Sequence, residues 1–298
     1  MTLVVAGATA DIGFLVADTL LSFEYEFKDR VGIVNGQSHA LKIQIIDENT
    51  AIAFAGDVSV ALAMIKQILT VIVVNPAYNV PEQLFRIYRQ AVEASDNEDV
   101  PDCEFLVLQL ILTGKRLAHI TSKGVRYCSR AYIGDAAEYA QLLKLRRPYC
   151  PPQIRQIQLA DGTFRAEPLI VTDGEIEFAE ISDAMERLTH QRRSTTVGAI
   201  SGCVVRVVDA RISGKLEYLQ CAEASLSPAE GHSGYSLLCS NADVRGIGIY
   251  YRSGNLGFLF CVGDSKMCRK EYAETIDEFI AIARAKYGLN LTGGTFIN

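Results

Sequence analysis

Two short apolar runs open the chain, at residues 3–8 and 12–17. Both are rich in residues that favour strands, and the short polar stretch at residues 9–11 is typical of a tight connection, so together they predict a β-hairpin. Closing the hairpin on those three residues and continuing its register sets Thr2 directly across from Asp18. Because cross-strand partners have Cβ atoms about 4.5–5.5 Å apart, the pattern places a carboxylate beside the start of the first strand.

A second hairpin is predicted by the apolar runs at residues 42–46 and 50–55, which flank a polar turn. The register that we expect for it sets Lys42 opposite Ala55 and next to Gly56. Both hairpins therefore bring candidate functional groups to strand ends, where such groups are accessible. Pairing alone leaves open whether the two ends meet in space.

The rest of the chain shows helical periodicity and strand-like runs in separate groups. Asp57 suits the N-cap of an apolar helix, and Pro81 suits the first turn of the helix after it. Residues 222–240 turn to Ser, Gly, Ala and Pro and predict a linker. We expect helices at about residues 57–75, 80–94, 135–145, 177–191 and 271–287, and strands at about residues 103–112, 116–128, 197–208, 212–220, 244–251 and 256–262.

Grouped strands and grouped helices favour sheets that are covered by helices, an α+β fold, over a regular βαβ alternation. The elements divide into a domain at residues 1–225 and a C-terminal β-β-α extension at residues 226–298. Within the first domain, an irregular, proline-bearing insert is expected at about residues 146–176.

Composition narrows the class of partner. The 298 residues carry a net charge of -6 with a pI near 5.4, and this acidic balance argues against binding to nucleic acid or to an anionic membrane. No apolar stretch is long enough to span a bilayer, and the N-terminus has no secretory signal pattern. Eight scattered cysteines without a C-x-x-C pair are typical of reduced, buried residues in a cytoplasmic protein.

Metal and cofactor chemistry find little support in the sequence. The four histidines have no ligand spacing, so no metal site is predicted. No phosphate-binding loop follows a strand, and Gly246-Ile247-Gly248 is better explained as strand glycines, so no cofactor is predicted. Cys203 or Cys239 could serve as a nucleophile only with a histidine partner that the sequence does not identify.

Thr2 carries the candidate chemistry. Its small side chain predicts removal of Met1, which would leave a threonine with a hydroxyl and a free α-amine. Such a residue holds a nucleophile and its own base, because an α-amine has a reference pKa of about 7.7–8.0. The alternative is that Thr2 is an ordinary first residue of a strand.

Four stretches, taken in order, resemble the proteasome β-subunit family of N-terminal nucleophile hydrolases, which includes HslV-type and Anbu-type peptidases. They are Thr2-Leu3-Val4-Val5-Ala6-Gly7, Val16-Ala17-Asp18-Thr19, Lys42-Ile43 and Ala53-Phe54-Ala55-Gly56-Asp57. The order of elements is similar over roughly residues 2–220. The resemblance implies a four-layer αββα sandwich and a homo-oligomeric ring, with peptide or protein substrates and an unidentified unfoldase partner.

The resemblance also implies a role for each site residue. Thr2 would be the nucleophile of a threonine-type peptidase, and Lys42 the ammonium group that assists it. Asp18 would hold Lys42 in place, and the N–H of Gly56 would face the oxyanion.

The chain departs from the family at two supporting positions. Ile133-Gly134-Asp135-Ala136 stands where the family commonly has a Gly-Ser-Gly-Ser run, and the stretch 193–199 lacks the carboxylate expected there. Two alternatives therefore remain beside the peptidase. One is a non-catalytic proteasome-like scaffold or assembly subunit, and the other is an amidase that acts on small molecules.

Overall fold

A computed structural model describes twelve stretches of the chain. They are residues 2–21, 38–74, 79–95, 100–151, 154–158, 164–168, 170–195, 203–211, 213–223, 235–251, 254–264 and 268–292. Met1 and the stretch 196–202 lie outside the described residues, so the predicted removal of Met1 and most of the sequence at 193–199 have no structural counterpart here.

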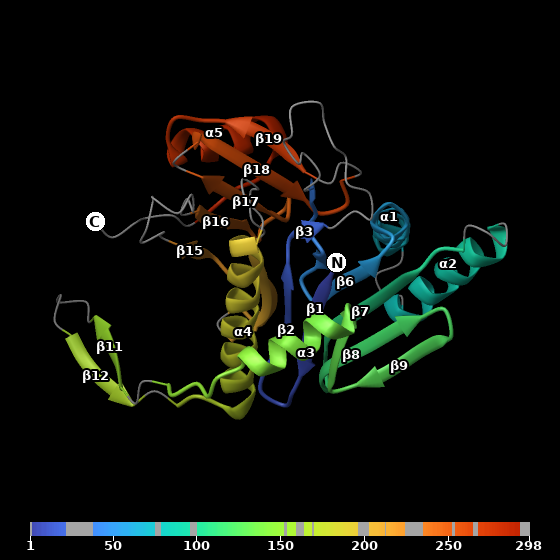
Figure 1. Ribbon diagram of the computed structural model, residues 1–298, viewed down its shortest axis with the longest axis horizontal. Helices are drawn as coiled ribbons and strands as arrows, with labels where there is room; N and C mark the ends of the chain where they lie inside the picture. The colour runs from blue at the N-terminus through green and yellow to red at the C-terminus, as the bar shows by residue number, and fades with distance from the viewer. Residues whose placement is uncertain are drawn as a thin grey trace.

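The described part of the chain contains three five-stranded antiparallel sheets (Figure 1). The first sheet has the order β10 (Arg130–Gly134), β1 (Leu3–Ala8), β2 (Gly13–Asp18), β13 (Val204–Ala210) and β14 (Lys215–Tyr218). The second has β5 (Ile43–Asp47), β6 (Thr50–Gly56), β7 (Cys103–Ile111), β8 (Gly114–Thr121) and β9 (Gly124–Cys128). The third has β15 (Cys221–Glu223), β16 (Tyr235–Ser240), β17 (Gly246–Tyr251), β18 (Leu256–Cys261) and β19 (Arg269–Tyr272).

Five helices and two short strand pairs complete the described elements. The helices are α1 (Val58–Val74), α2 (Val80–Ala94), α3 (Ala136–Leu145), α4 (Asp173–Thr195) and α5 (Ile276–Tyr287). The strand pairs are β3 (Leu20–Leu21) with β4 (Ser38–His39), and β11 (Ile154–Gln158) with β12 (Phe164–Pro168). The chain is thus a mixed α+β protein, as the grouping of its elements predicted.

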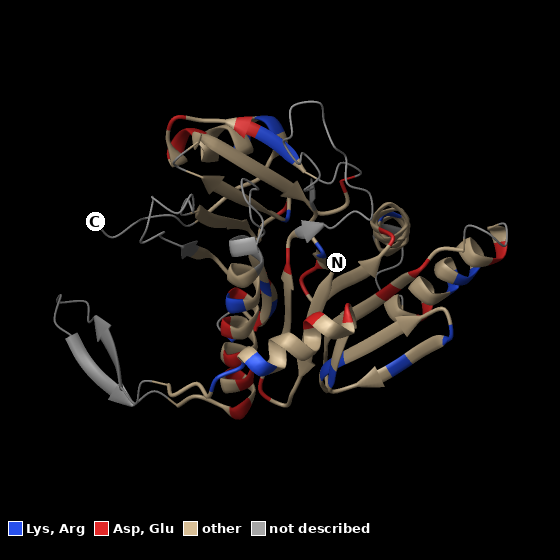
Figure 2. Ribbon diagram, in the orientation of Figure 1, with Lys and Arg blue, Asp and Glu red and all other residues tan. Residues whose placement is uncertain are grey.

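The largest apolar cluster joins one face of each of the three sheets. Val4 and Leu15 represent the first sheet in it, Leu106 the second, and Leu237 and Ile249 the third. The outer faces are covered by helices: α1 and α2 pack on the second sheet, α3 and α4 on the first, and α5 on the third (Figure 1). Charged residues are sparse on the central strands and concentrate on α4 and around turns (Figure 2).

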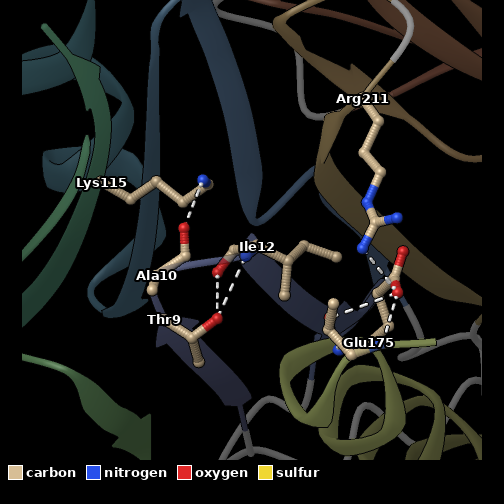
Figure 3. Close-up of polar contacts among 7 residues, drawn as sticks. Thr9, Ala10, Ile12, Lys115, Glu175 and Arg211 are labelled. Atoms are coloured by element: carbon tan, nitrogen blue, oxygen red, sulfur yellow. Dashed lines mark hydrogen bonds and ion pairs between the residues drawn. The ribbon is translucent and has the colours of Figure 1, made fainter. Parts of the chain in front are cut away.

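The register of the first hairpin differs by one residue from the prediction. Val4 pairs with Ala17, so continuing the ladder sets Leu3, and not Thr2, across from Asp18. The reason is a connection of four residues in place of three, in which the Thr9 hydroxyl donates to the Ile12 carbonyl and accepts from its N–H, both at 3.1 Å (Figure 3). A local hydrogen bond therefore decided the register.

The second hairpin is also displaced by one residue. The N–H of Phe54 donates to the carbonyl of Lys42 at 3.1 Å, so Lys42 lies opposite Phe54, where Ala55 was expected. The pairing shifts between Ile45 and Asp47, which marks a β-bulge. A bulge adds one unpaired residue to one strand, and the hydrophobic pattern does not reveal it.

The C-terminal region holds more strands than the predicted β-β-α extension. The expected linker at 222–240 contains β16, whose serines are buried: the Ser240 hydroxyl donates to the carbonyl of Val244 at 2.5 Å. The expected helix start at Glu271 is instead the edge strand β19, and α5 begins after Thr275, whose side chain accepts from the N–H of Glu278 at 3.1 Å. A serine can be buried in a core strand when its hydroxyl has a local hydrogen-bond partner. For this reason the composition of the segment indicated a linker although the segment contains a strand.

We expect Ile249→Ala to lower the free energy of unfolding by about 2–5 kcal/mol, because it opens a cavity in the core that the three sheets share. Urea unfolding should show one transition, at the same midpoint by far-UV circular dichroism and by tyrosine fluorescence. Leu112→Ala, at an exposed turn, is the control and should leave the midpoint unchanged. A separate early transition would contradict a shared core.

Candidate active site

A buried ion pair joins the ends of the two hairpins. Lys42 Nζ lies 2.9 Å from Asp18 Oδ1, and both side chains are 0% exposed. Asp18 is the last residue of β2, and Lys42 immediately precedes β5. The structure therefore brings together two predicted site residues from different sheets, which pairing along each hairpin could not establish.

The burial of this pair is costly, which makes its position informative. Removing a carboxylate and an ammonium from water costs several kcal/mol per ion, and their attraction offsets this cost only with good geometry. Well-packed apolar residues of similar volume often give equal or greater stability. Stability alone is thus a weak reason for two charges at this position.

Thr2 is held at the same end of the molecule by its backbone. Its carbonyl accepts a hydrogen bond of 2.9 Å from the N–H of Asp135. Gly134 has a φ of +94°, and a Cβ placed on it would lie 1.9 Å from the Thr2 carbonyl oxygen and 3.5 Å from the Cβ of Ala55. The start of β1 therefore lies within a few ångströms of the end of β6, and the half-buried Thr2 retains access to solvent.

Gly56 ends β6 at an exposed position with a φ of +92°. A Cβ there would lie 1.9 Å from the carbonyl oxygen of Asp102, which accepts from the N–H of Asp57 at 2.9 Å. Both the backbone conformation and the close approach require glycine. These contacts account for the glycine at this position.

The sequence reasoning missed two supporting roles, those of Asp135 and Glu104. Asp135 caps α3, with Oδ1 accepting from the N–H groups of Ala137 at 2.7 Å and Glu138 at 3.1 Å. Glu104 accepts from the N–H of Gly134 at 3.2 Å, which steadies the turn that contacts Thr2. An aspartate directly before a helical pattern is a readable N-cap signal, whereas nothing in the local sequence marks Glu104.

The Glu104 carboxyl has a pKa below its usual range. The main cause is His119, whose Nε2 lies 3.7 Å from Glu104 Oε1, and the hydrogen bond from Gly134 adds to it, against the opposing effect of burial. Glu104 is therefore ionised at neutral pH. It places a fixed negative charge near the start of the chain.

The cysteine alternatives have the wrong environment for a thiolate. Burial raises the pKa of Cys103 to about 12 and also raises that of Cys239. Cys203 is fully buried, with its Sγ 3.4 Å from the hydroxyl of Tyr251. A reactive cysteine needs an accessible, electropositive site that stabilises the thiolate. These three cysteines lack such a site, so Thr2 is the better candidate nucleophile.

Metal ligation and membrane crossing find no support in the part of the chain that the structure describes. No group of three or more His, Cys, Asp or Glu side chains there is placed to hold a metal ion. Among the described helices, none combines the length and the apolar character needed to cross a membrane.

The chain was compared with known protein families and with curated proteins. Neither a scan against protein-family models nor a search of the curated proteins finds a match to this chain.

Breaking the buried pair should destabilise the fold. We expect Asp18→Ala to lower the free energy of unfolding by about 3–5 kcal/mol, because it removes the charge that lies against the buried ammonium of Lys42. Replacing both partners by apolar residues, Asp18→Leu with Lys42→Met, should restore most of the loss. Denaturant unfolding measures each variant.

The control for this experiment is Glu93→Ala, which breaks an exposed pair with Arg89 on α2. It should leave the unfolding free energy almost unchanged, because solvent screens exposed ion pairs. If the double replacement is no more stable than Asp18→Ala, the burial of the charges is not the cause of the loss.

Thiol labelling should separate the cysteines by environment. Cys150 is exposed and should react with iodoacetamide within the first minutes at neutral pH. Cys103 and Cys239 should stay unmodified in the folded protein up to about pH 10, because burial raises both pKa values and the thiolate is the reactive form. Peptide mapping by mass spectrometry measures the order. Early labelling of Cys239 would contradict its burial.

Proposed function

We propose that the chain is an N-terminal threonine hydrolase, a peptidase or amide hydrolase that uses Thr2 after removal of Met1. The observation that carries the proposal is the buried Lys42–Asp18 pair at the end of the molecule where β1 begins. A costly pair of charges beside a residue that can become an amino-terminal nucleophile is better explained by catalysis than by stability.

In this proposal the Thr2 hydroxyl attacks the carbonyl carbon of an amide. Its proton passes to the α-amine of Thr2 and then to the departing amine as the C–N bond breaks. The Oγ–acyl ester that remains is hydrolysed by water, which regenerates the hydroxyl and releases a carboxylic acid. The Thr2 hydroxyl is the nucleophile of the first half-reaction and water is that of the second, and the α-amine of Thr2 is the base in both, so no further general base is required.

The surrounding residues would supply electrostatics. The ammonium of Lys42 favours an uncharged neighbouring amine and stabilises the hydroxyl oxygen as it loses its proton. Asp18 keeps that ammonium in position and balances its charge. The N–H of Gly56 would donate to the developing oxyanion, an interaction whose loss typically costs about 10²–10³-fold in rate.

The wider architecture is consistent with this proposal. Helices cover the outer faces of two sheets that share a core, which supports the four-layer αββα sandwich of proteasome-like hydrolases as the fold. By the same resemblance we propose a cytoplasmic homo-oligomer, such as a ring, that acts on peptide or protein substrates with an unfoldase partner.

A second candidate is a proteasome-like scaffold without turnover. It is favoured by the stretch Ile133-Gly134-Asp135-Ala136, which stands where the resembled family has a Gly-Ser-Gly-Ser run and in which the Asp135 carboxylate caps α3. The two N–H donors hold Asp135 in its capping role, which gives that residue a structural function.

Intact-mass analysis with a threonine-directed β-lactone tests the hydrolase. We expect the purified chain to lack Met1 and to gain the mass of one adduct. Thr2→Ala should abolish the adduct and Thr2→Ser should keep it, because a serine retains both the hydroxyl and the amine. Lys42→Met should slow labelling by at least about 100-fold, with circular dichroism to verify folding.

A chain that retains Met1, or that gains the adduct equally well with alanine at position 2, contradicts the hydrolase and leaves the scaffold. If labelling succeeds, a panel of peptide and non-peptide amides distinguishes a peptidase from an amidase of small molecules.

A further inference from the structure

We propose that the outer edge of β10 is a docking site for an extended peptide segment that carries an acidic side chain. The site lies outside the candidate catalytic group, and the proposal holds whether or not Thr2 is a nucleophile. It depends on three features of the structure: unpaired backbone groups along β10, a cavity beside them, and a cation in that cavity without a carboxylate partner.

The backbone of β10 has one open edge, because β10 is the terminal strand of the first sheet and pairs with β1 alone. In an antiparallel ladder, hydrogen-bonded and non-bonded pairs alternate. The bonds from Asp135 N to Thr2 O and from Ala8 N to Ser129 O identify the bonded pairs of this ladder.

By that alternation Arg130, Tyr132 and Gly134 direct their N–H and C=O groups away from β1. The bond from Gly134 N to Glu104 supports this assignment, because it lies on the outer side. Within the described residues, no other group bonds to the backbone N–H or C=O of Arg130 or Tyr132. An edge of this kind is a template for one more strand.

A cavity of about 470 Å³ lies against this edge, so an added strand has room for side chains. Its lining includes Glu104, His119 and Arg126, which come from three neighbouring strands of the second sheet. The lining also includes Tyr132 and Tyr139, whose rings stack with their centroids 3.8 Å apart. The volume falls within the range of about 300–1,000 Å³ that small ligand sites occupy.

Arg126 supplies the charge that favours an acidic ligand, in a cavity that also contains the ionised Glu104. Arg130 is neutralised by Glu177, with Nη2 2.8 Å from Oε2, and Arg146 is paired with Glu180. The guanidinium of Arg126 contacts His119 Nδ1 at 3.4 Å, and among the described residues no carboxylate lies within ion-pairing distance of it. A ligand carboxylate would give Arg126 its missing partner.

The occupant that satisfies all three features is an extended peptide with a glutamate or aspartate. Its backbone would pair with Arg130 and Tyr132, one side chain would enter the cavity, and its carboxylate would meet Arg126. A free carboxylate alone would leave the strand edge unpaired, and an uncharged strand would leave the arginine without a partner.

The test uses a fluorescent peptide of alternating valine and threonine with one central glutamate, titrated against the full chain by fluorescence anisotropy. We expect saturable binding, about tenfold tighter than that of the same peptide with lysine in place of glutamate. N-methylation of alternate backbone nitrogens should weaken binding by at least about tenfold, because it removes the strand hydrogen bonds.

Protein variants test the assigned cation. Arg126→Glu should reverse the preference, so that the lysine peptide binds more tightly than the glutamate peptide. Lys66→Glu, at an exposed position on α1, makes the same change of net charge elsewhere and should leave the preference intact.

Several results would overturn the proposal. They are no saturable binding up to about 1 mM peptide, equal binding of the N-methylated peptide, or an equal effect of Lys66→Glu and Arg126→Glu. Sedimentation of the chain without and with the peptide tests another occupant of the edge. A dimer that dissociates when the peptide is added would assign this edge to a second copy of the chain.

Discussion

The arrangement of this protein around its N-terminus depends on one buried electrostatic contact, between Lys42 and Asp18. Each charge comes from the end of a different hairpin, and each is removed from water by the packing of the first two sheets. Because an isolated buried charge would be far more costly than the pair, the two hairpin ends must stay in contact. The pair therefore acts as a geometric constraint between the sheets.

Backbone contacts add a second constraint at the same end. Gly134 and Gly56 both adopt positive φ, and each lies where a side chain would collide with a neighbouring carbonyl group. One close approach holds Thr2 against the strand–helix junction at Asp135, and the other fixes the end of β6 against Asp102. These contacts bring the candidate nucleophile and the candidate oxyanion donor to one region with little freedom in their main chains.

Strand β10 has two edges with different roles. Its inner edge pairs with β1 and, through the turn that follows, holds the carbonyl of Thr2. Its outer edge faces a cavity with backbone groups and an arginine available to a ligand. Two strands, β10 and β1, would separate a peptide bound there from β2, where Asp18 ends its strand, so docking and one part of the proposed chemistry would share the first sheet.

The sequence by itself determined which segments become the first hairpins and the main helices, because hydrophobic periodicity reports local structure directly. It also singled out Thr2, Asp18, Lys42 and Gly56. Only the tertiary structure decided both registers, the contact between Lys42 and Asp18, and the identity of β16 as a core strand. A bulge after Ile45, the hydroxyl of Thr9 and the buried hydroxyl of Ser240 each change pairing or burial through individual hydrogen bonds. Periodicity cannot encode such contacts, since shifting a strand by one residue preserves its alternation and reverses its faces.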